Sequence, residues 1–305
     1  SFEDMTNVSK ETRTMLEANF VINHIKVDTM QRSTDGTVKN AVRLHDDLIV
    51  ESVLIPTKTR TTACVSSQVG CSLDCNFCAT ARLKRMRNLQ TDEIYDQVVM
   101  IKQQVEKTYD QNLSNIVFMG MGEPLLNYKN VLKAIEKITS PDGLGMSPRR
   151  ITVSTAGVAK QIKQLGDDQV KFKLALSLHA ANDKKRNEIM PINESNNIES
   201  LIEALNYFYK KTGNEITFEY ILFKDFNDSE KDAMELVKIY RQVPADLINV
   251  IEYNAIDRFP FDKPDEDGFE RFVEILQKNR VNVRIRRSRG KDIDAACGQL
   301  ANKDN

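Results

Sequence analysis

The spacing of hydrophobic and polar positions changes repeatedly along the chain, and it predicts alternating strands and helices from residue 61 onward. Short apolar runs, typical of buried strands, are followed by longer stretches in which apolar residues recur every three or four positions. The predicted strands cover residues 62–66, 115–119, 150–154, 172–178, 216–222, 248–253 and 282–287. The predicted helices cover residues 91–108, 128–138, 158–165, 183–189, 198–211, 229–241 and 267–279.

This alternation indicates a parallel sheet whose strands are joined by helical crossovers. Six strand–helix units predict an α/β fold, a partial (β/α)6 TIM-like barrel that stays open instead of closing with eight units. In both kinds of barrel the functional site lies at the C-terminal ends of the strands, so the residues that follow each strand are the first candidates for chemistry.

The first part of the chain has a different pattern. Residues 1–36 predict a helical lead-in, with Ser9 as a suitable N-cap. Two β-rich stretches, 38–44 and 48–54, are separated by the polar residues 45–47, which predicts a β-hairpin. We therefore expect a short helical and hairpin lead-in before the barrel and a strand extension after it.

The composition is that of an ordinary globular protein, with 41% hydrophobic and 29% charged residues in 305. No run of about 18 uncharged apolar residues is present, and the sequence Ser1-Phe2-Glu3-Asp4 has no signal-peptide character. Five cysteines do not form a disulfide framework in a chain of this size, and they imply a reducing compartment. We expect a cytoplasmic protein with no membrane partner.

The charge distribution is more informative than the net charge of −1, which by itself predicts no nucleic-acid partner. Residues 278–291 contain seven basic side chains and no acidic one, and residues 82–87 contain four more basic side chains. A solvated surface is the ordinary explanation for either cluster alone. Because both clusters stand near cysteines of interest, they favour a local phosphate-binding surface, with Arg286 and Arg287 as candidate contacts.

The strongest chemical signal is the CxxxCxxC spacing of Cys71, Cys75 and Cys78. Three thiolates in one short loop can hold a [4Fe–4S] cluster while leaving one iron without a protein ligand, whereas ordinary ferredoxin clusters take four cysteines. A zinc site with a distant fourth ligand is a second interpretation, although no second CxxC or HxxxH stands nearby. Three unrelated buried thiols are a third.

A second motif follows the strand at residues 115–119. Gly120, Gly122 and Glu123 form a turn in which glycines allow close backbone approach and a carboxylate can accept hydrogen bonds from an ammonium group. Alone, this is an ordinary tight turn. After the cysteine loop it resembles the radical S-adenosylmethionine (SAM) superfamily, in which SAM chelates the open iron; the resemblance implies that Gly122 and Glu123 contact the SAM amino group.

The resemblance extends over residues 45–301, nearly the whole chain. The matching segments are CVSSQVGC at 64–71, GMGEPLLN at 120–127, SPRR at 147–150, SLH at 177–179, MPIN at 190–193 and DIDAACGQL at 292–300. They are similar to the bacterial dual-specificity adenine-C2 methyltransferases of 23S ribosomal RNA and transfer RNA. An antibiotic-resistance relative of that family methylates adenine carbon 8, and the sequence PLLN at 124–127 favours the C2 type.

The resemblance implies a role for each cysteine and for one carboxylate. Cys71, Cys75 and Cys78 would hold the cluster, Cys297 would carry a methyl group, and Cys64 would resolve a covalent protein–RNA adduct. Glu51 would act as the base. From the residues alone, Cys64 is more often a small buried strand residue and Cys297 could likewise be structural, while Glu51 would be an exposed strand carboxylate.

The same resemblance implies that Ser154, Ser177, Leu178, His179 and Asn254 contact SAM. From the residues alone, Ser154 could instead cap a helix, and His179 could be a hydrogen-bonded core histidine.

Carbon 2 of adenine is electron-poor, so a radical route is needed, and the resemblance implies two SAM molecules per turnover. The first methylates Cys297. The second is reduced to a deoxyadenosyl radical, which takes hydrogen from the S-methyl group so that the carbon radical adds to the base. Glu51 then removes the ring proton, and Cys64 attacks Cys297 to release methylated RNA and leave a transient disulfide. An electron donor such as a flavodoxin system would supply reducing equivalents.

The resemblance also suggests a domain division: residues 1–56 as the remnant of an N-terminal helical domain plus the hairpin, 57–301 as the radical SAM catalytic domain with its extension, and 302–305 as a tail. We expect a monomer that binds a base flipped out of its RNA stack. The alternatives are a C8-adenine methyltransferase and, in a different class, a non-catalytic iron–sulfur or zinc protein that binds RNA.

Overall fold

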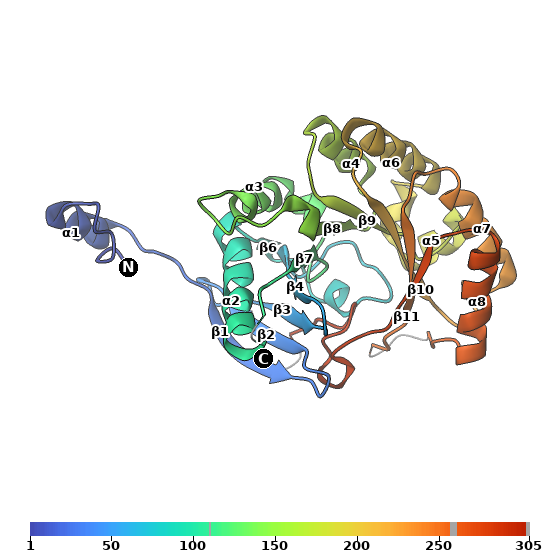
Figure 1. Cartoon of the computed structure of the whole chain (residues 1–305), viewed down its shortest axis with the longest axis horizontal. Coiled ribbons are helices and arrows are strands. Elements are labelled where there is room, and N and C mark those ends of the chain that lie inside the picture. The colour runs from blue at the N-terminus through green and yellow to red at the C-terminus, as the bar shows by residue number, and fades with distance from the viewer. Residues whose placement is uncertain (110, 257–260, 303–305) are drawn as a thin grey trace.

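The computed structural model describes residues 1–109, 111–256 and 261–302, so most of the predicted tail lies outside the described residues. A ten-stranded sheet with the order β1-β2-β3-β4-β7-β8-β9-β10-β11-β12 forms its centre (Figure 1). The strands are β1 (Lys26–Arg32), β2 (Val38–Arg43), β3 (Ile49–Pro56), β4 (Thr61–Cys64), β7 (Asn115–Phe118), β8 (Ile151–Thr155), β9 (Lys173–Ser177), β10 (Ile216–Leu222), β11 (Leu247–Glu252) and β12 (Val283–Arg286). A separate two-stranded sheet pairs β5 (Gln68–Val69) with β6 (Arg87–Asn88).

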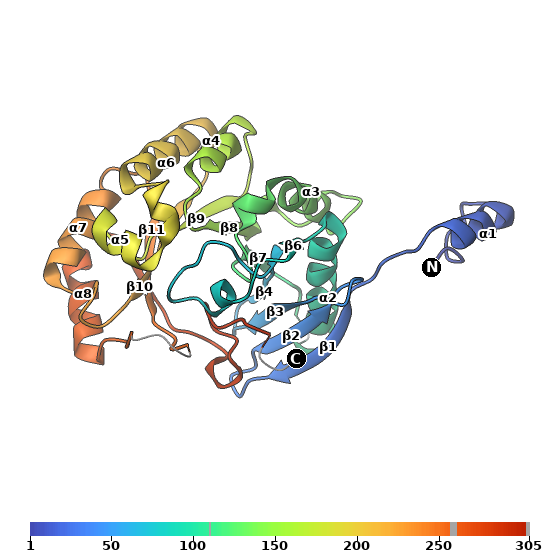
Figure 2. The same cartoon turned by 180° about the vertical axis from the view of Figure 1, so that it is seen from behind.

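From β4 to β12 all neighbouring strands are parallel, and each crossover carries at least one helix. The helices are α2 (Thr91–Tyr109), α3 (Tyr128–Thr139), α4 (Ala159–Asp167), α5 (Asp183–Ile189), α6 (Ile198–Thr212), α7 (Glu230–Tyr240) and α8 (Glu266–Lys278). They cover the outer face of the curved sheet (Figures 1 and 2). The predicted open (β/α)6 barrel is confirmed. Of the helices in the described segments, none combines the length and apolar character that crossing a membrane needs.

The helix ends show why the periodic patterns began and ended where they did. At α7, Ser229 and Asp232 form a capping box in which each side chain accepts from the other residue's backbone N–H. At α6, the Asn197 side chain accepts from the N–H of Ser200, and Gly213 ends the helix at a φ of 64°.

The front of the chain extends the same sheet through antiparallel pairing. Strands β2 and β3 form the predicted hairpin, and β3 pairs with β4, with Val53 opposite Cys64. The helical prediction for residues 1–36 is confirmed for α1 (Lys10–Asn19), which Ser9 caps, but it is wrong for β1. Strand β1 stands at the sheet edge and is mostly exposed, so its polar sequence has little of the apolar alternation that identifies a half-buried strand.

Helix α1 lies apart from the barrel (Figures 1 and 2). None of its ten residues, all within the described chain, is buried. An extended segment joins it to β1, so packing against the barrel contributes little to the stability of this helix.

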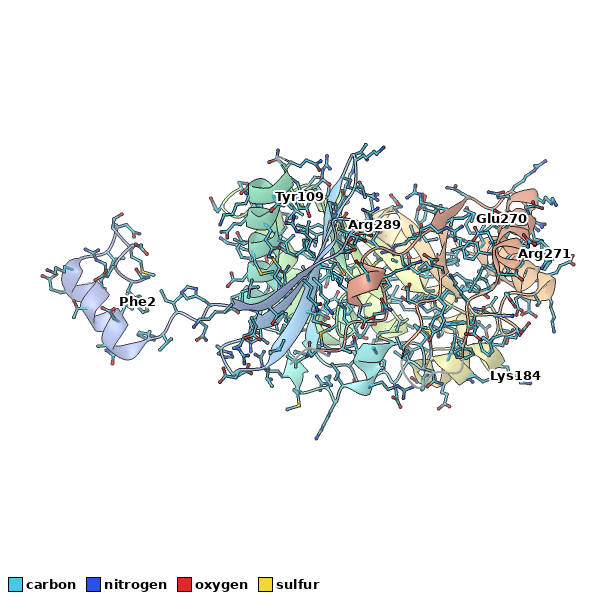
Figure 3. The ribbon with its side chains drawn as sticks, turned by 90° about the horizontal axis from the view of Figure 1, so that it is seen from below. Phe2, Tyr109, Lys184, Glu270, Arg271 and Arg289 are labelled. Atoms are coloured by element: carbon cyan, nitrogen blue, oxygen red, sulfur yellow. The ribbon has the colours of Figure 1, made fainter. Side chains whose placement is uncertain are left out.

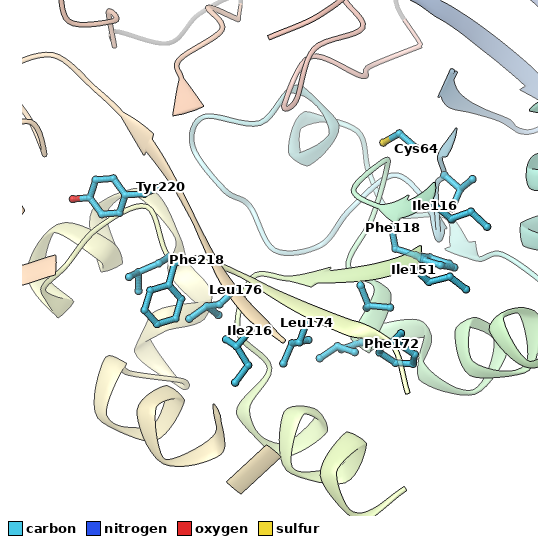
Figure 4. Packing of buried hydrophobic residues seen from close by; sticks show 14 of the residues in the cluster. Cys64, Ile116, Phe118, Ile151, Phe172, Leu174, Leu176, Ile216, Phe218 and Tyr220 are labelled. Atoms are coloured by element: carbon cyan, nitrogen blue, oxygen red, sulfur yellow. The ribbon is translucent and has the colours of Figure 1, made fainter. Parts of the chain in front are cut away.

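Alternation along the barrel strands separates the core from the lumen. On β10, Phe218 and Tyr220 point into the layer between sheet and helices, while Thr217, Glu219 and Ile221 face inward. Figure 4 shows the outward side chains packed together, and the Tyr220 and Phe272 rings stack with their centroids 5.6 Å apart. The strands therefore build an apolar layer under the helices and leave chemically varied side chains on the lumen.

Candidate active site

A cavity of about 550 Å³ occupies the barrel lumen and the loops at the C-terminal ends of the strands. All five cysteines, Cys64, Cys71, Cys75, Cys78 and Cys297, line it. They come from β4, from the loop after it and from the C-terminal segment, so the fold gathers thiols that are far apart in the sequence.

The loop with Cys71, Cys75 and Cys78 is held by its own backbone and by the C-terminal segment. Gly70 enters it at a φ of +74°, and a Cβ there would lie 2.5 Å from the carbonyl oxygen of Lys84, so only glycine fits. At the other end, the N–H of Ala79 donates to the carbonyl of Gly298 at 2.7 Å. The loop and the segment that carries Cys297 therefore share a hydrogen bond.

The three loop thiols fit the electrostatic requirements of an iron–sulfur cluster. Burial raises the pKa of Cys71 to about 11 and also raises the pKa values of Cys75 and Cys78. The charges of neighbouring cysteines raise these pKa values further. A thiolate in this position thus needs a positive partner such as iron. Among the described residues no group of three His, Cys, Asp or Glu side chains converges on a single ion. A [4Fe–4S] cluster does not require its ligands to converge on one ion, because each cysteine binds a different iron.

Glu123 lies deep in the cavity wall and is 3% exposed. Its carboxylate accepts hydrogen bonds from the N–H groups of Leu125 at 3.0 Å and Ala156 at 2.8 Å, while burial raises its pKa. Gly122 precedes it at a φ of +91°, where a Cβ would stand 2.4 Å from the Cβ of Gln68. The turn is therefore restricted to glycine, and the carboxylate orientation is fixed by two backbone donors.

The serines predicted to contact SAM lie side by side on neighbouring strands. The Oγ atoms of Ser154 and Ser177 are 3.3 Å apart, and both residues line the cavity. Leu178 differs, because its side chain lies in the hydrophobic core at 1% exposure. A contact from Leu178 to a bound ligand is thus restricted to its backbone.

His179 has a left-handed backbone with a φ of 55°, and its imidazole lines the cavity. The Nδ1 atom accepts from the N–H of Ile221 at 3.1 Å, so the proton of the neutral ring resides on Nε2. Burial, together with the charge of Arg186, lowers the pKa of His179 to about 3. The ring is therefore a neutral hydrogen-bond donor at physiological pH, packed edge-on against Phe77 at 4.8 Å.

Arg186 is a site residue that the sequence did not indicate. It is fully buried on α5 and donates to the carbonyls of Leu178 at 3.1 Å, Ala156 at 2.6 Å and Ser177 at 3.2 Å. It thereby ties together the strand ends that carry the two serines. One sequence signal could have indicated it. Arg186 stands three residues before Ile189, so the two share one face of the helix, and a charged residue on a buried helix face is unusual.

Cys297 and Cys64 face the same part of the lumen. The carbonyl of Cys297 accepts from Asn254 Nδ2 at 3.3 Å, and Arg286 Nη2 lies 3.6 Å from the Cys297 sulfur. Burial, with an added contribution from Cys297, raises the pKa of Cys64 to about 12. In Figure 4 the Cys64 sulfur points away from the packed side chains of Ile116 and Phe118.

The basic run before Cys297 is used largely within the chain, contrary to the prediction of phosphate contacts from Arg286 and Arg287. Arg286 points into the lumen and pairs with Glu219 at 3.0 Å. Arg287 pairs with Glu266 and Glu252. Arg289 pairs with Asp35 at 3.2 Å, beside the hairpin strands (Figure 3). These side chains are neutralised by carboxylates that lie far away in the sequence and close in the fold.

Glu51 stands on β3, is 2% exposed, and is absent from the described residues that line the cavity. Its Oε2 accepts from the N–H groups of Ala301 at 2.7 Å and Asn302 at 3.2 Å, and its Oε1 lies 3.3 Å from Lys39 Nζ. In this arrangement the carboxylate holds the end of the segment that carries Cys297. Of the predicted residues, all but Glu51, Leu178 and Asn254 line the cavity, and Asn254 adjoins it through its hydrogen bond to the Cys297 carbonyl.

The fold and the three-cysteine loop define the class: the profile of the Radical SAM superfamily matches residues 65–237, and its members use a [4Fe–4S] cluster and SAM. The chain is 64% identical over 303 residues to a probable dual-specificity RNA methyltransferase RlmN from Christiangramia forsetii, covering 99% of this chain and 86% of that protein. A protein of the same description from Flavobacterium psychrophilum is 64% identical, with 100% and 87% covered. The crystal structure of a radical SAM methyltransferase from Sphaerobacter thermophilus superposes with a TM-score of 0.92 at 37% identity, covering 98% of this chain and 88% of that one. The chain belongs to the dual-specificity RNA methyltransferase RlmN family.

Proposed function

We propose that this protein methylates carbon 2 of an adenosine in 23S ribosomal RNA and in transfer RNA. The observation that carries the proposal is the placement of Cys64 and Cys297 in the same lumen as the three loop cysteines. A methyl-carrying thiol must reach both the radical source and the thiol that later releases it. One cavity of about 550 Å³ meets both requirements.

Cys71, Cys75 and Cys78 would hold the [4Fe–4S] cluster, and Gly122, Glu123, Ser154, Ser177, His179, Asn254 and the Leu178 backbone would hold SAM. When bound, this pair supplies the methyl group and the radical chemistry that an electron-poor carbon requires. His179 offers a neutral donor, and Glu123 offers a carboxylate already fixed by backbone N–H groups. The donor role of His179 requires no charge change near neutral pH.

Cys297 would accept the methyl group as a nucleophilic thiolate. Cys64 would later attack the Cys297 sulfur, forming a disulfide while the bond between that sulfur and the transferred carbon breaks. The high pKa of Cys64 keeps it a thiol until that step, which limits premature attack. An external reductant then restores both thiols.

Glu51 would be the base, and its contacts define a condition for that role. Its carboxylate accepts from Ala301 and Asn302 in the docked arrangement. We propose that the C-terminal segment moves off Glu51 before proton removal. A Glu51→Gln variant should then still methylate Cys297 while releasing no methylated RNA.

We further propose that the protein works as a cytoplasmic monomer, with electrons from a flavodoxin-type donor and residues 57–301 as its catalytic domain. RNA is the partner that the family description implies. The exposed residues Arg82, Lys84 and Arg85 remain the candidate phosphate contacts, whereas Arg87 pairs with Glu93 and Asp46.

The test is mass spectrometry of RNA nucleosides after anaerobic reaction with SAM and reductant, on ribosomal and transfer RNA separately. The expected product is 2-methyladenosine with the wild-type protein and none with Cys297→Ala. Formation of 8-methyladenosine would assign the C8 activity instead. Deoxyadenosine without RNA methylation would keep the radical SAM chemistry and overturn the RNA substrate. Stoichiometric zinc with no response to SAM would indicate the non-catalytic binding protein.

A further inference from the structure

Three neighbouring strands place a row of hydrogen-bonded polar side chains beneath Cys297. Glu219 on β10 accepts from Asn249 Nδ2 on β11 at 2.7 Å, and from Arg286 on β12 at 3.0 Å. The opposite edge of the Arg286 guanidinium reaches the Cys297 sulfur at 3.6 Å. All four residues line the lumen.

Arg286 is held in this direction by more than one contact. Glu219 is 4% exposed, so its charge is compensated inside the protein, and Arg286 Nη1 provides the compensation. The same Nη1 also approaches the sulfur of Met119 at 3.5 Å. With one edge of the planar guanidinium fixed by Glu219, its free edge is directed at Cys297.

We propose that Arg286 is the positioning residue of the methyl-carrying thiol, holding the Cys297 sulfur in the lumen and stabilising it by a cationic hydrogen bond when it attacks a methyl donor. This inference rests on the proposed role of Cys297. It replaces the phosphate contact that the sequence predicted for Arg286.

The step that Arg286 assists is a nucleophilic displacement at the methyl carbon of SAM. The Cys297 thiol proton goes to solvent, and the thiolate electron pair forms a bond to the methyl carbon of SAM. The bond from that carbon to the SAM sulfonium breaks, and its electron pair stays on the leaving S-adenosylhomocysteine. Because the attacking sulfur carries a full negative charge, a cationic donor held 3.6 Å away orients and stabilises it during the attack.

The charged and titratable groups around Cys297 come from several elements. Arg286 faces it from β12, Cys64 from β4 and Cys78 from the cysteine loop, while Glu219 lies behind the guanidinium. The negative charges of Cys297 and Glu219 raise the pKa of Arg286, so it remains a cation throughout the working pH range. Arg286 thus pairs with the carboxylate of Glu219 and is the cation that faces the Cys297 sulfur.

The test measures the reactivity of Cys297 without RNA or SAM. Anaerobic protein with its cluster is treated with iodoacetamide at pH 7, and alkylation of the unmethylated Cys297 peptide is followed by mass spectrometry. We expect Arg286→Met to slow this alkylation about ten-fold, the effect of losing one charge-assisted hydrogen bond to the attacking sulfur. Arg286→Lys should give a rate between those of wild type and Arg286→Met, because it keeps the cation but loses the planar group that reaches Glu219 and Cys297 together.

Arg284→Met is the matched control. Arg284 lies two residues earlier on the same strand and also lines the cavity, and we expect unchanged Cys297 alkylation. Glu219→Gln keeps an amide oxygen as the acceptor that anchors Arg286 but removes a negative charge from the lumen, so it should speed alkylation. This variant decides the outcome if Arg286→Met does not fold.

Equal alkylation rates in wild type and Arg286→Met would overturn the proposal, as would unchanged or slower alkylation in Glu219→Gln. The result is separable from the proposed function, because alkylation requires no RNA. If wild-type protein makes no methyladenosine while the Arg286 effect persists, the RNA assignment fails and the role of Arg286 toward Cys297 stands.

Discussion

At the residue scale, two glycines with positive φ differ in their surroundings, one crowded and one open. This difference determines how much stability the protein loses when each glycine is replaced by alanine. Gly122 has a φ of +91°, and an added Cβ would lie 2.4 Å from Gln68 Cβ; Gly145 has a φ of +61° with no described atom within 4 Å. We predict that Gly145→Ala lowers the free energy of unfolding by about 1 kcal/mol through backbone strain alone. Gly122→Ala should cost about 3 kcal/mol or more, because strain and overlap add.

Urea unfolding of both variants measures the difference. Gln68 also accepts from the N–H of Glu123 at 2.8 Å, so Gly122→Ala should weaken SAM binding in addition, whereas Gly145→Ala should not. Equal losses of stability in the two variants would contradict the assigned overlap.

His179 makes stability depend on pH in a defined direction. Its pKa is about 3 in the folded protein against 6.5 ordinarily. Between these values the unfolded chain binds the extra proton, so stability falls as the pH drops below 6.5, by ~1.4 kcal/mol per unit, until about pH 3. Compared with His179→Gln, wild type should lose about 2 kcal/mol more between pH 6.5 and pH 5 in urea titrations. Parallel pH profiles for the two proteins would show that the imidazole is not buried in its neutral form.

The residues of the site differ in how far their sequence revealed them. The spacing of Cys71, Cys75 and Cys78 lies within one loop, so the sequence itself contains their proximity. The directions of Glu51 and Arg286 depend on which side of a strand faces the lumen and on a partner far along the chain. Local pattern does not contain that information, so the sequence predicted neither the contact of Glu51 with Ala301 nor the pairing of Arg286 with Glu219.

At the scale of elements, the segment of residues 297–302 is docked by single hydrogen bonds from several directions. Thr80 Oγ1 donates to the carbonyl of Leu300 at 2.6 Å, and Glu51 accepts from Ala301 and Asn302. We predict that Glu51→Gln speeds amide hydrogen exchange at these two residues up to about ten-fold, since a charged acceptor contributes ~1 kcal/mol more than the neutral amide oxygen that replaces it. Glu93→Gln, which breaks the buried pair with Arg87, should leave exchange in this segment unchanged.

Helix α1, unlike the segment of residues 297–302, is expected to contribute nothing to the stability of the barrel. None of its residues in the described chain is buried, and a ten-residue helix gains little stability in isolation. Removal of residues 1–20 should therefore leave the urea midpoint of the barrel unchanged. A fall in that midpoint would show that α1 packs against the barrel in solution.

The sequence predicted helices and strands well where burial gives them a regular apolar pattern, and poorly where the element is exposed or very short. The barrel strands and helices α2 to α8 carry strong apolar periodicity, and their ends lie close to the predicted ones. Strand β1 has an exposed, polar sequence, and the two-residue strands β5 and β6 are too short to show any period. These elements form because tertiary pairing supplies the hydrogen bonds that their sequences do not specify.

At the scale of the whole molecule, the first strands and the last segment are joined directly. Asp292 accepts from Ser33 Oγ at 2.5 Å and from the N–H of Thr34 at 3.0 Å, and Asn302 Nδ2 donates to the carbonyl of Ile49 at 2.9 Å. We predict that Asp292→Ala lowers the urea midpoint, and that adding Ser33→Ala lowers it by less than the sum of the two single effects. Strict additivity in this double-mutant cycle would mean that the contact contributes nothing.

The overall architecture followed from the sequence because six repeats of the same strand–helix unit leave few alternatives. The union of the hairpin with the barrel did not follow, since it depends on the pairing of β3 with β4 across residues 57–60. That pairing places Val53 opposite Cys64 and continues one sheet from the front of the chain into the site.

The contact between Glu51 and Ala301 joins residues 250 positions apart, and this has a consequence for protein synthesis. A ribosome delivers β1 to β11 before it delivers Cys297, so the barrel emerges with its lumen uncovered and its buried carboxylate without the backbone donors that complete it. High contact order slows such a closing step, and the exposed intermediate is the species that chaperones recognise. The Cys297 thiol is therefore placed only after strands β1 to β11 have been made, so a chain interrupted before residue 297 would lack the thiol that we propose carries the methyl group.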